Sequence, residues 1–410
     1  MSMRTEMIAV FLPFLTGLAV TAQDWTRFRG SNGTGISQAK GVPVKWTESD
    51  YLWRAEIPGT SHSQPVIWGD KIFVTSALNK GRERTLICLD KKNGEPVWHK
   101  KYTMETHRKH RLNSYASSSP AVDAKRVCAS FVTPDRFLVM AWDHAGEELW
   151  SREFGSFDSQ HGHGASPIIL EGKVIVVGDQ RSGSFITALD ARSGKDVWTC
   201  ERRNSKKTAY GTPCLIARDG KKELLTVSLS HGISSLDFET GELNWEALVF
   251  DKRPVASPVV AGDLVFGSCG AGGGGNYLVA VRLGGEGDVT TSHTSYEIRR
   301  QAPYVPTPVA IGNRLYFTSD RGIATCVEAD SGRVIWQERL AKGFFGSPVW
   351  IDGKIYCNSM EGETLVFEAE DTFKLLAKNP LLEESYSTPC VDGNRLYIKT
   401  FSHLICVGEE

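Results

Sequence analysis

The stretch ALDARSGKDVW, residues 188–198, contains the pattern that decides the fold of this chain. The same order of residues occurs in CLDKKNGEPVW at 88–98, AWDHAGEELW at 141–150, SLDFETGELNW at 235–245 and CVEADSGRVIW at 326–336. Each copy runs from an acidic residue through a glycine to a tryptophan. We interpret it as a strand, a turn and an outer strand, whose indole packs against the neighbouring repeat and donates its N–H to a carbonyl.

Eight prolines give the length of the repeat. They follow one another at intervals of 40 to 55 residues, and they are Pro65, Pro120, Pro167, Pro213, Pro258, Pro308, Pro348 and Pro389. This period is typical of the four-stranded blade of a β-propeller. The eight landmarks therefore predict eight blades.

The texture inside each period is that of β-structure. Runs such as IFVTS, VIVVG and LYFTS are β-branched or aromatic and are bounded by Gly-Asp, Asp-Gly and Gly-Asn turns. No helical period persists over a dozen residues. The sequence thus predicts an all-β protein, an eight-bladed propeller of four-stranded antiparallel blades.

The last repeat stops before its outer strand, and the other end of the chain offers a replacement. YLWRAEIPG, residues 51–59, carries Trp53 at the outer-strand position. We expect this strand to complete the C-terminal blade and close the ring, which removes two exposed sheet edges. The tryptophans expected at the joints between blades are Trp53, Trp98, Trp150, Trp198, Trp245 and Trp336. In the fifth repeat Tyr296 or Ile298 stands near that position, after a glycine-rich insertion, and in the seventh it is Leu376.

The first 22 residues resemble a signal peptide. Arg4 precedes an apolar stretch from Met7 to Val20, and small residues lead to Ala22. We expect residues 1–22 to be removed on export, and residues 23–410 to form one propeller domain in the periplasm or outside the cell. The apolar stretch is too short to span a bilayer, and no later segment is long enough. A net charge of −1 without a long basic run argues against a nucleic-acid partner.

Nine cysteines in an exported chain raise the question of disulfides. Cys88, Cys326 and Cys406 occupy matching places in different repeats, and so do Cys214 and Cys390. Matching places in different blades lie too far apart to pair. We therefore expect mostly buried free thiols, which behave as small hydrophobic side chains.

The repeats are similar to those of the secreted bacterial proteins with pyrroloquinoline-quinone (PQQ)-binding-like β-propeller repeats. The acidic-to-Gly-to-Trp pattern and the phrases DWTRFRGSNGTGIS, NSYASSSP, GHGASP, GGEGDVT, APYVPTP and WQERL carry the resemblance over nearly all of the mature chain. The wider superfamily contains quinoprotein alcohol dehydrogenases and the propeller lipoprotein of the bacterial outer-membrane assembly complex. The resemblance implies the fold and says little about chemistry.

Membership among the quinoprotein enzymes would imply PQQ, a calcium ion, a catalytic Asp and a disulfide between adjacent cysteines. This sequence has no adjacent cysteines, and Asp90, Asp190 and Asp237 are accounted for as turn residues of the repeat. We predict no catalytic residue and no cofactor, with PQQ and calcium as the alternative.

Histidines suggest the one candidate for a metal site. His161 and His163 would share a face if they lay on a strand, but no third ligand can be named, so we predict no metal site. We interpret His107 and His110 as solvated residues of a long loop.

Loops that enter the inner strands, and loops that join the second and third strands, meet on one face of a propeller. The residues expected there are His62, Tyr115, His163, Tyr210 and Tyr304 from the first set, and Arg181, His231, Arg321, Glu361 and His403 from the second. Such side chains around a concave opening suit a protein or small-molecule ligand. The sequence thus favours a monomeric, non-catalytic binding or scaffolding module. A PQQ-type oxidoreductase and a carbohydrate-active propeller enzyme are the alternatives.

Overall fold

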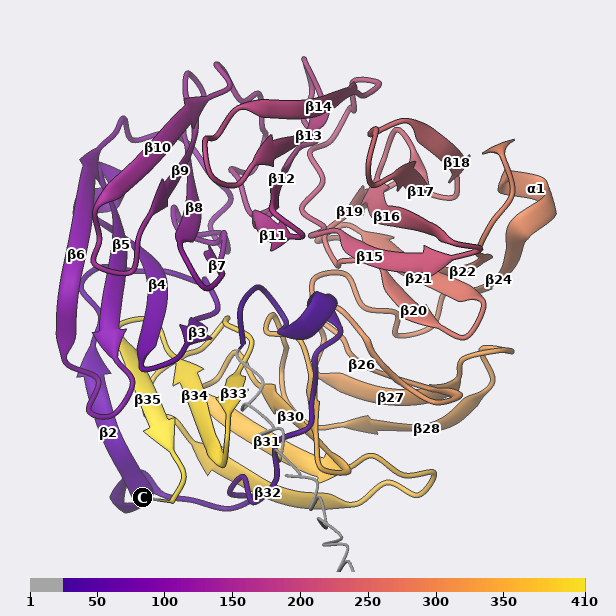
Figure 1. Cartoon of the computed structure of the whole chain (residues 1–410). Coiled ribbons are helices and arrows are strands. Elements are labelled where there is room, and N and C mark those ends of the chain that lie inside the picture. The colour runs from indigo at the N-terminus through magenta and orange to yellow at the C-terminus, as the bar shows by residue number, and fades with distance from the viewer. Residues whose placement is uncertain (1–24, 410) are drawn as a thin grey trace, which may run out of the picture.

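The computed structural model describes residues 25–409, in which the strands form eight sheets arranged in a ring around a central channel (Figure 1). Each sheet contains four antiparallel strands, which follow chain order from the channel outward in all blades except the last, and a few sheets gain short extra strands. The prediction of an eight-bladed all-β propeller is confirmed. The expected signal peptide, residues 1–22, lies outside the described residues.

The first four blades follow one another directly along the chain. Blade 1 contains β3 (Val66–Trp68), β4 (Lys71–Leu78), β5 (Glu83–Asp90) and β6 (Pro96–Thr103). Blade 2 contains β7 (Ala121–Val122), β8 (Val127–Val132), β9 (Phe137–Trp142) and β10 (Glu148–Glu153). Blade 3 contains β11 (Ile168–Leu170), β12 (Lys173–Gly178), β13 (Phe185–Asp190) and β14 (Asp196–Glu201). Blade 4 contains β15 (Cys214–Arg218), β16 (Lys221–Ser228), β17 (Gly232–Asp237) and β18 (Leu243–Ala247).

Among the remaining blades, blades 5 and 7 gain a short strand and blade 8 takes its outer strand from the N-terminal part of the chain. Blade 5 contains β19 (Arg253–Pro254), β20 (Val259–Ala261), β21 (Leu264–Gly270), β22 (Tyr277–Arg282) and β24 (Thr294–Ile298). Blade 6 contains β25 (Val309–Ile311), β26 (Arg314–Thr318), β27 (Ile323–Glu328) and β28 (Val334–Arg339). Blade 7 contains β29 (Val349–Ile351), β30 (Lys354–Asn358), β31 (Glu363–Glu368) and β32 (Leu375–Pro380), with β1 (Ile36–Ser37) parallel to β29. Blade 8 contains β33 (Cys390–Asp392), β34 (Arg395–Lys399), β35 (His403–Val407) and β2 (Tyr51–Glu56).

The tight turns explain how such short sequences reverse direction. Between β11 and β12, Glu171 and Gly172 both have positive φ, 47° and 76°. Two consecutive residues in this region match the right-handed twist of the flanking strands, which is why two-residue hairpins favour them. The middle strands of each blade are buried on both sides, because their side chains pack between adjacent blades.

The ring closes as predicted, through a strand from the N-terminal part of the chain. β2 pairs antiparallel with β35, and Trp53 lies opposite Cys406. In Figure 1 the indigo strand β2 lies beside the yellow strand β35. The closing contact therefore joins segments about as far apart in sequence as the fold allows.

Indoles of the outer strands bind the next blade. Five of the six donate their Nε1–H to a backbone carbonyl just after the third strand of that blade, at 2.8 to 3.3 Å: Trp53 to Lys91, Trp98 to His144, Trp150 to Ala191, Trp198 to Phe238 and Trp336 to Glu370. Gly241 shows why the pattern needs glycine, since its φ is +77° and a Cβ there would lie 2.4 Å from the Trp198 ring. In blade 5 the hydroxyl of Tyr296 takes the place of the indole and donates to Ala329.

Trp245 departs from this expectation. Its indole donates to the Glu223 carboxylate of its own blade, at 3.3 Å. The glycine-rich insertion of the fifth repeat forms β23 (Gly287–Asp288), which pairs with β18 beside Trp245, and α1 (Thr290–His293). The insertion covers the outer edge of blade 4 and fully buries the indole. In blade 7 the expectation of Leu376 is wrong by one residue: the register places Ala377, opposite Val366, at this position, so this joint has neither an indole nor a phenol.

All nine cysteines carry free thiols, and eight of them are buried, as expected. Burial raises the pKa of the Cys88 thiol to about 12 and that of Cys214 to about 11. Thiols with such pKa values are poor nucleophiles and poor metal ligands at neutral pH. Their role in the described structure is packing.

Replacing Trp198 by alanine should lower the free energy of unfolding by about 3–5 kcal/mol, because a large buried aromatic side chain is lost. Trp198→Phe, which keeps an aromatic ring but loses the bond to Phe238, should cost less. Denaturant melts of both variants measure the two losses. A loss below about 1 kcal/mol for Trp198→Ala would show that the joint contributes little to stability.

Candidate functional site

The N-terminal segment crosses the central channel, a feature the sequence analysis missed. In Figure 1 it is the indigo segment in the middle of the ring. Its carbonyls at Trp25, Thr26 and Gly35 accept the N–H groups of Ile67, Val122 and Trp350, all on inner strands. The side chain of Asn32 exchanges two hydrogen bonds with the backbone of Leu215 on β15, at 2.7 and 2.8 Å. The segment thereby caps free inner-strand edges that would otherwise face the channel.

Arg29 anchors this segment. Its side chain is fully buried, and the guanidinium donates to the carbonyls of Thr307, Pro308 and Pro348, at 2.6 to 3.1 Å. It also donates to Gly33 and Thr34 of its own segment. Burial lowers the pKa of Arg29 to about 9. Carbonyl oxygens thus replace the water that a buried guanidinium loses.

A ring of hydrogen bonds surrounds the channel just above this segment. Each landmark proline directly precedes an inner strand, and the hydroxyl of the residue before it accepts the N–H of the equivalent residue in the preceding blade. The bonds, 2.8 to 3.3 Å long, run from Gln64 to Ser119, Ser119 to Ser166, Ser166 to Thr212, Thr212 to Ser257, Ser257 to Thr307, Thr307 to Ser347 and Ser347 to Thr388. This hydroxyl ring fixes the blades to one another at the channel.

Gln64 interrupts the hydroxyl ring in blade 1. Its side-chain oxygen accepts the Arg29 N–H at 2.6 Å, and its side-chain nitrogen donates to the Pro389 carbonyl at 2.7 Å. A longer amide stands where the other blades have a hydroxyl. The Gln64 side chain thereby joins blade 1 to blade 8 directly and also binds the N-terminal segment.

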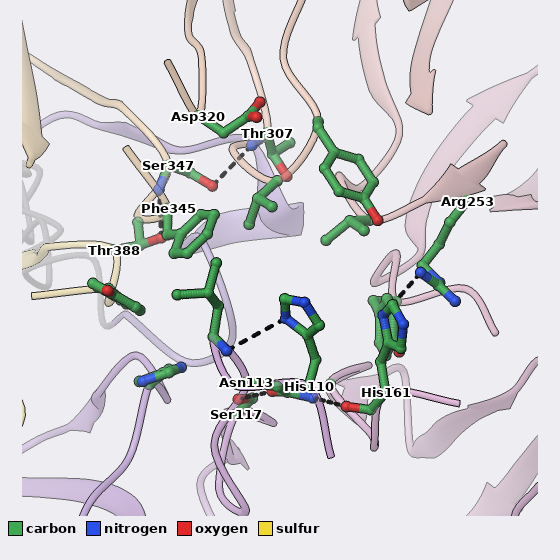
Figure 2. A pocket seen from close by; sticks show the side chains of 18 of the residues that line it. His110, Asn113, Ser117, His161, Arg253, Thr307, Asp320, Phe345, Ser347 and Thr388 are labelled. Atoms are coloured by element: carbon green, nitrogen blue, oxygen red, sulfur yellow. Dashed lines mark hydrogen bonds between the residues drawn. The ribbon is translucent and has the colours of Figure 1, made fainter. Parts of the chain in front are cut away.

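Above the hydroxyl ring lies a cavity of about 440 Å³, which we call the cup (Figure 2). Phe28 of the N-terminal segment belongs to its lining, so this segment closes the channel side. The walls come from loops that enter the inner strands. The residue three positions before each landmark proline lines the cup in every blade: His62, Ser117, Gly164, Tyr210, Val255, Val305, Phe345 and Tyr386.

One side of the cup is aromatic. The rings of Phe345 and Tyr386 meet edge to face with centroids 4.9 Å apart, and Tyr386 lies 4.9 Å from the His62 ring. His62 in turn stacks on Phe401 at 5.5 Å. These rings offer an apolar surface with polar edges, which suits an aromatic or aliphatic ligand group.

The opposite side is polar and basic. His110 and His161 lie with ring centroids 4.8 Å apart, and the guanidinium of Arg253 donates to His161 Nδ1 at 2.9 Å (Figure 2). Asn113 Nδ2 donates to the backbone of His161 at 2.9 Å and so fixes the two loops together.

The imidazoles of the cup are neutral at physiological pH. Burial lowers the pKa of His62 to about 3, with further contributions from Lys399 and Lys109. Burial and then Arg253 lower the pKa of His161 to about 4. Asp320 on the far wall has a raised pKa because of burial. The fixed charge around the basic side therefore comes from arginine and lysine.

The structure brings together four of the predicted face residues in the lining of the cup: His62, Tyr210, Tyr304 and Arg321. The other six do not line it. Tyr115 donates to the His107 carbonyl, Arg181 pairs with Asp158, and the Glu361 carboxylate accepts the Lys342 N–H.

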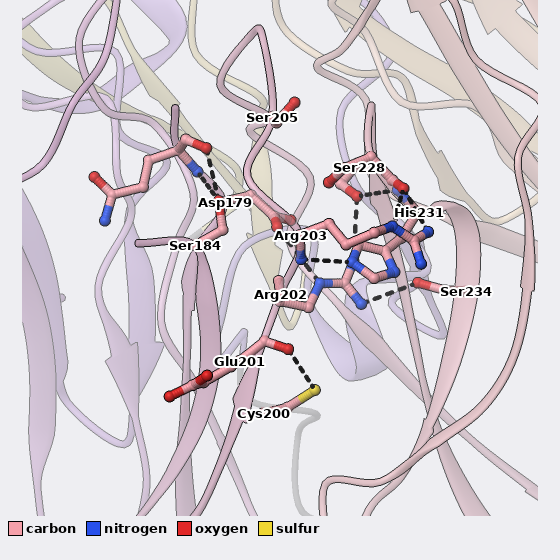
Figure 3. A network of polar contacts seen from close by, with 12 residues as sticks. Asp179, Ser184, Cys200, Glu201, Arg202, Arg203, Ser205, Ser228, His231 and Ser234 are labelled. Atoms are coloured by element: carbon pink, nitrogen blue, oxygen red, sulfur yellow. Dashed lines mark hydrogen bonds and ion pairs between the residues drawn. The ribbon is translucent and has the colours of Figure 1, made fainter. Parts of the chain in front are cut away.

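The three remaining histidines and their neighbours are engaged elsewhere. His163 packs between Phe137 and Phe157, with centroids 5.2 Å from each. His231 Nδ1 contacts the Glu246 carboxylate at 2.6 Å. Its Nε2 accepts the Arg203 backbone N–H in the network of Figure 3. His403 contacts Glu383, Arg54 and Ser402.

Residues missed by the sequence analysis are His110, His161 as a lining residue, Arg253, Asp320, Phe345 and Tyr386. Position relative to the landmark proline would have found Phe345 and Tyr386, which lie three residues before Pro348 and Pro389. No comparable signal marks Arg253, which lies on the short strand β19.

His161 and His163 do not act together. They lie on a loop, and their rings point to different surroundings, the cup and the core. Among residues 25–409, no group of three or more His, Cys, Asp or Glu side chains is placed to hold a metal ion.

Comparison with known proteins gives the family. The family described as outer membrane protein assembly factor BamB matches residues 103–338 and 301–400, together most of the chain. The chain belongs to this family. BamB of Moranella endobia (strain PCIT) is 23% identical over 308 residues, which are 69% of this chain and 72% of that protein.

The dehydrogenase relatives share less. The 1-butanol dehydrogenase (cytochrome c) of Thauera butanivorans is 29% identical over 133 residues, and the match spans only 18% of that enzyme's length. A europium-containing methanol dehydrogenase superposes with a TM-score of 0.67 at 12% identity, over 94% of this BamB-family chain and 98% of the enzyme. This likeness shows the shared propeller fold.

The cup does not provide the residues that PQQ with calcium would require. Calcium takes six to eight oxygen ligands, several of them carboxylates, whereas the lining of the cup contains the single carboxylate of Asp320. The sequence has no adjacent cysteines.

Within residues 25–409, no helix is both long and apolar enough to cross a bilayer.

Stability should fall as the pH is lowered from 7 to 5. Burial lowers the pKa values of His62 and His163 to about 3, whereas histidine in the unfolded chain titrates near 6.5. Below pH 6.5 the unfolded state therefore binds protons that the folded state cannot, and the stability contributed by each neutral imidazole is lost as the pH falls toward 3. Urea melts of the wild type and of His163→Gln at both pH values measure this, and the variant should lose less. An equal loss in both would contradict the assignment.

Proposed function

We propose that this chain is an exported, non-catalytic propeller that binds a partner protein in the cup. The observation that carries the proposal is the cup itself, a cavity closed by the N-terminal segment and framed by aromatic rings, neutral imidazoles and the guanidinium groups of Arg253 and Arg321. Such a mixture is typical of the centre of a protein-binding site, where aromatic residues and arginine are enriched.

Membership of the BamB family supports the same reading. The relative from Moranella endobia is described as an outer membrane protein assembly factor. We infer a related scaffolding role for this chain in the periplasm or outside the cell, as a monomeric propeller whose mature form begins at Gln23.

The non-catalytic part of the proposal rests on the chemistry of the lining. Cup residues that are able to act as acids or bases are partly engaged by neighbouring groups, as His161 is by Arg253 and Asp320 is by Asn276. The alternative is an oxidoreductase, favoured by the short match to the butanol dehydrogenase. The donor set described above argues against its quinone-and-calcium form.

Photocrosslinking in the native host tests the proposal. A benzoyl-phenylalanine replacing Tyr304 in the cup should form protein adducts on irradiation. The same group replacing Lys195, exposed in the turn between β13 and β14 at the opposite end of the blades, should form none. Gel shift and mass spectrometry of the purified adducts provide the readout.

Two results would count against the proposal. Equal crosslinking from both positions, or none from the cup, would show that the cup does not hold a protein. Chelator-sensitive oxidation of an alcohol after addition of PQQ and Ca²⁺ would favour the enzymatic alternative.

A further inference from the structure

Cations without carboxylate partners surround one half of the cup. They come from the segments that enter blades 2, 4 and 5, and none forms an ion pair with any carboxylate in residues 25–409: Arg108, Lys109, Arg111, Lys207 and Arg253. We call these five residues the basic rim. Elsewhere on the molecule cations commonly pair, as Arg181 does with Asp158.

The basic rim lies within electrostatic reach of the cup. Burial lowers the pKa of His161, and the charges of Arg253, Arg108 and Lys207 lower it further. The charge of Arg111 lowers the pKa of Tyr386, against the larger rise that burial causes. Arg108 and Arg111 are exposed, on the loop that carries His110 and Asn113 into the wall. Both charges are therefore exposed to solvent on a loop that forms part of the wall of the cup.

Arg253 is the buried member of the rim. Only 5% of its surface is exposed, and its partners are all neutral: the Thr208 carbonyl, the Gln160 side-chain oxygen and His161. These bonds use three of the five N–H donors of the guanidinium. A buried cation without a counter-ion is costly, and an anion entering the cup would offset that cost.

The other half of the cup differs in charge and character. Arg321 of blade 6 also lines the cup there, but Asp320, Glu361 and Glu384 lie on the same side, together with the aromatic rings of Phe345 and Tyr386. The two halves would therefore fix the orientation of a ligand: its anionic part is attracted to the basic rim, and its apolar part packs against Phe345 and Tyr386.

We propose that the cup receives an acidic peptide segment of a partner protein. Its carboxylates bind at the basic rim, and a neighbouring aromatic or aliphatic side chain packs against Phe345 and Tyr386. The inference rests on the proposed function and specifies the partner's chemistry. Association between exposed charges is screened by salt, so the binding should weaken as ionic strength rises.

Fluorescence anisotropy with the full mature chain tests the inference. The probe is a fluorescein-labelled peptide with one phenylalanine followed by four aspartates, and its matched control has four asparagines. The acidic peptide should bind at least about tenfold more tightly than the control, equivalent to about 1.4 kcal/mol. The double variant Arg108→Glu/Arg111→Glu should weaken binding by about tenfold or more. The control variant Lys125→Glu/Lys195→Glu, which reverses two exposed charges at the opposite end of the blades, should change it less than about twofold.

Equal binding of both peptides, or equal weakening by both double variants, would overturn the inference. Circular dichroism melts of the variants check that each is folded. If the cup crosslinks to a protein while the acidic peptide fails to bind, the inference falls and the proposed function stands. If crosslinking is absent as well, both fall.

Discussion

The structure depends on one hydrogen bond repeated around the channel. In each step a backbone N–H of one blade is accepted by the hydroxyl of a Ser or Thr in the next, directly before a proline that begins the inner strand. The proline has no N–H to leave unpaired and holds the preceding residue in an extended conformation. A single residue per blade thereby sets how closely the blades approach at the centre. The indoles of the outer strands set the same spacing at the periphery.

The cup follows from this constraint. Residues three positions before each proline are held at a fixed place above the hydroxyl ring, so eight loops of different length all contribute to one cavity. The channel below is filled by the N-terminal segment, and Gln64, at the one position of the ring without a hydroxyl, accepts the backbone N–H of Arg29 in that segment. The residue that closes the ring is thus also one of those that hold the floor of the cup.

The fold could be predicted almost completely because its signals are local and repeated: a turn, a glycine and an indole within eleven residues, and a proline once per blade. The site could be predicted only in part. Tyr210 and His62 were found because each lies three residues before a landmark proline. His163 lies four residues before Pro167, and its ring packs between Phe137 and Phe157 instead of lining the cup. The path of the N-terminal segment was missed because its bonds run to backbone carbonyls, which any sequence provides.

The most direct test of the hydroxyl ring is the stability of Thr307→Val against Thr307→Ser. In the wild type the Thr307 hydroxyl accepts the buried Ser257 N–H at 2.9 Å. Valine keeps the shape of threonine but removes this acceptor, whereas serine retains the hydroxyl. Denaturant melts should show a loss of about 1–3 kcal/mol for the valine variant and a clearly smaller loss for serine. A valine variant as stable as the wild type, or one no less stable than the serine variant, would contradict the claim that this ring holds the blades together.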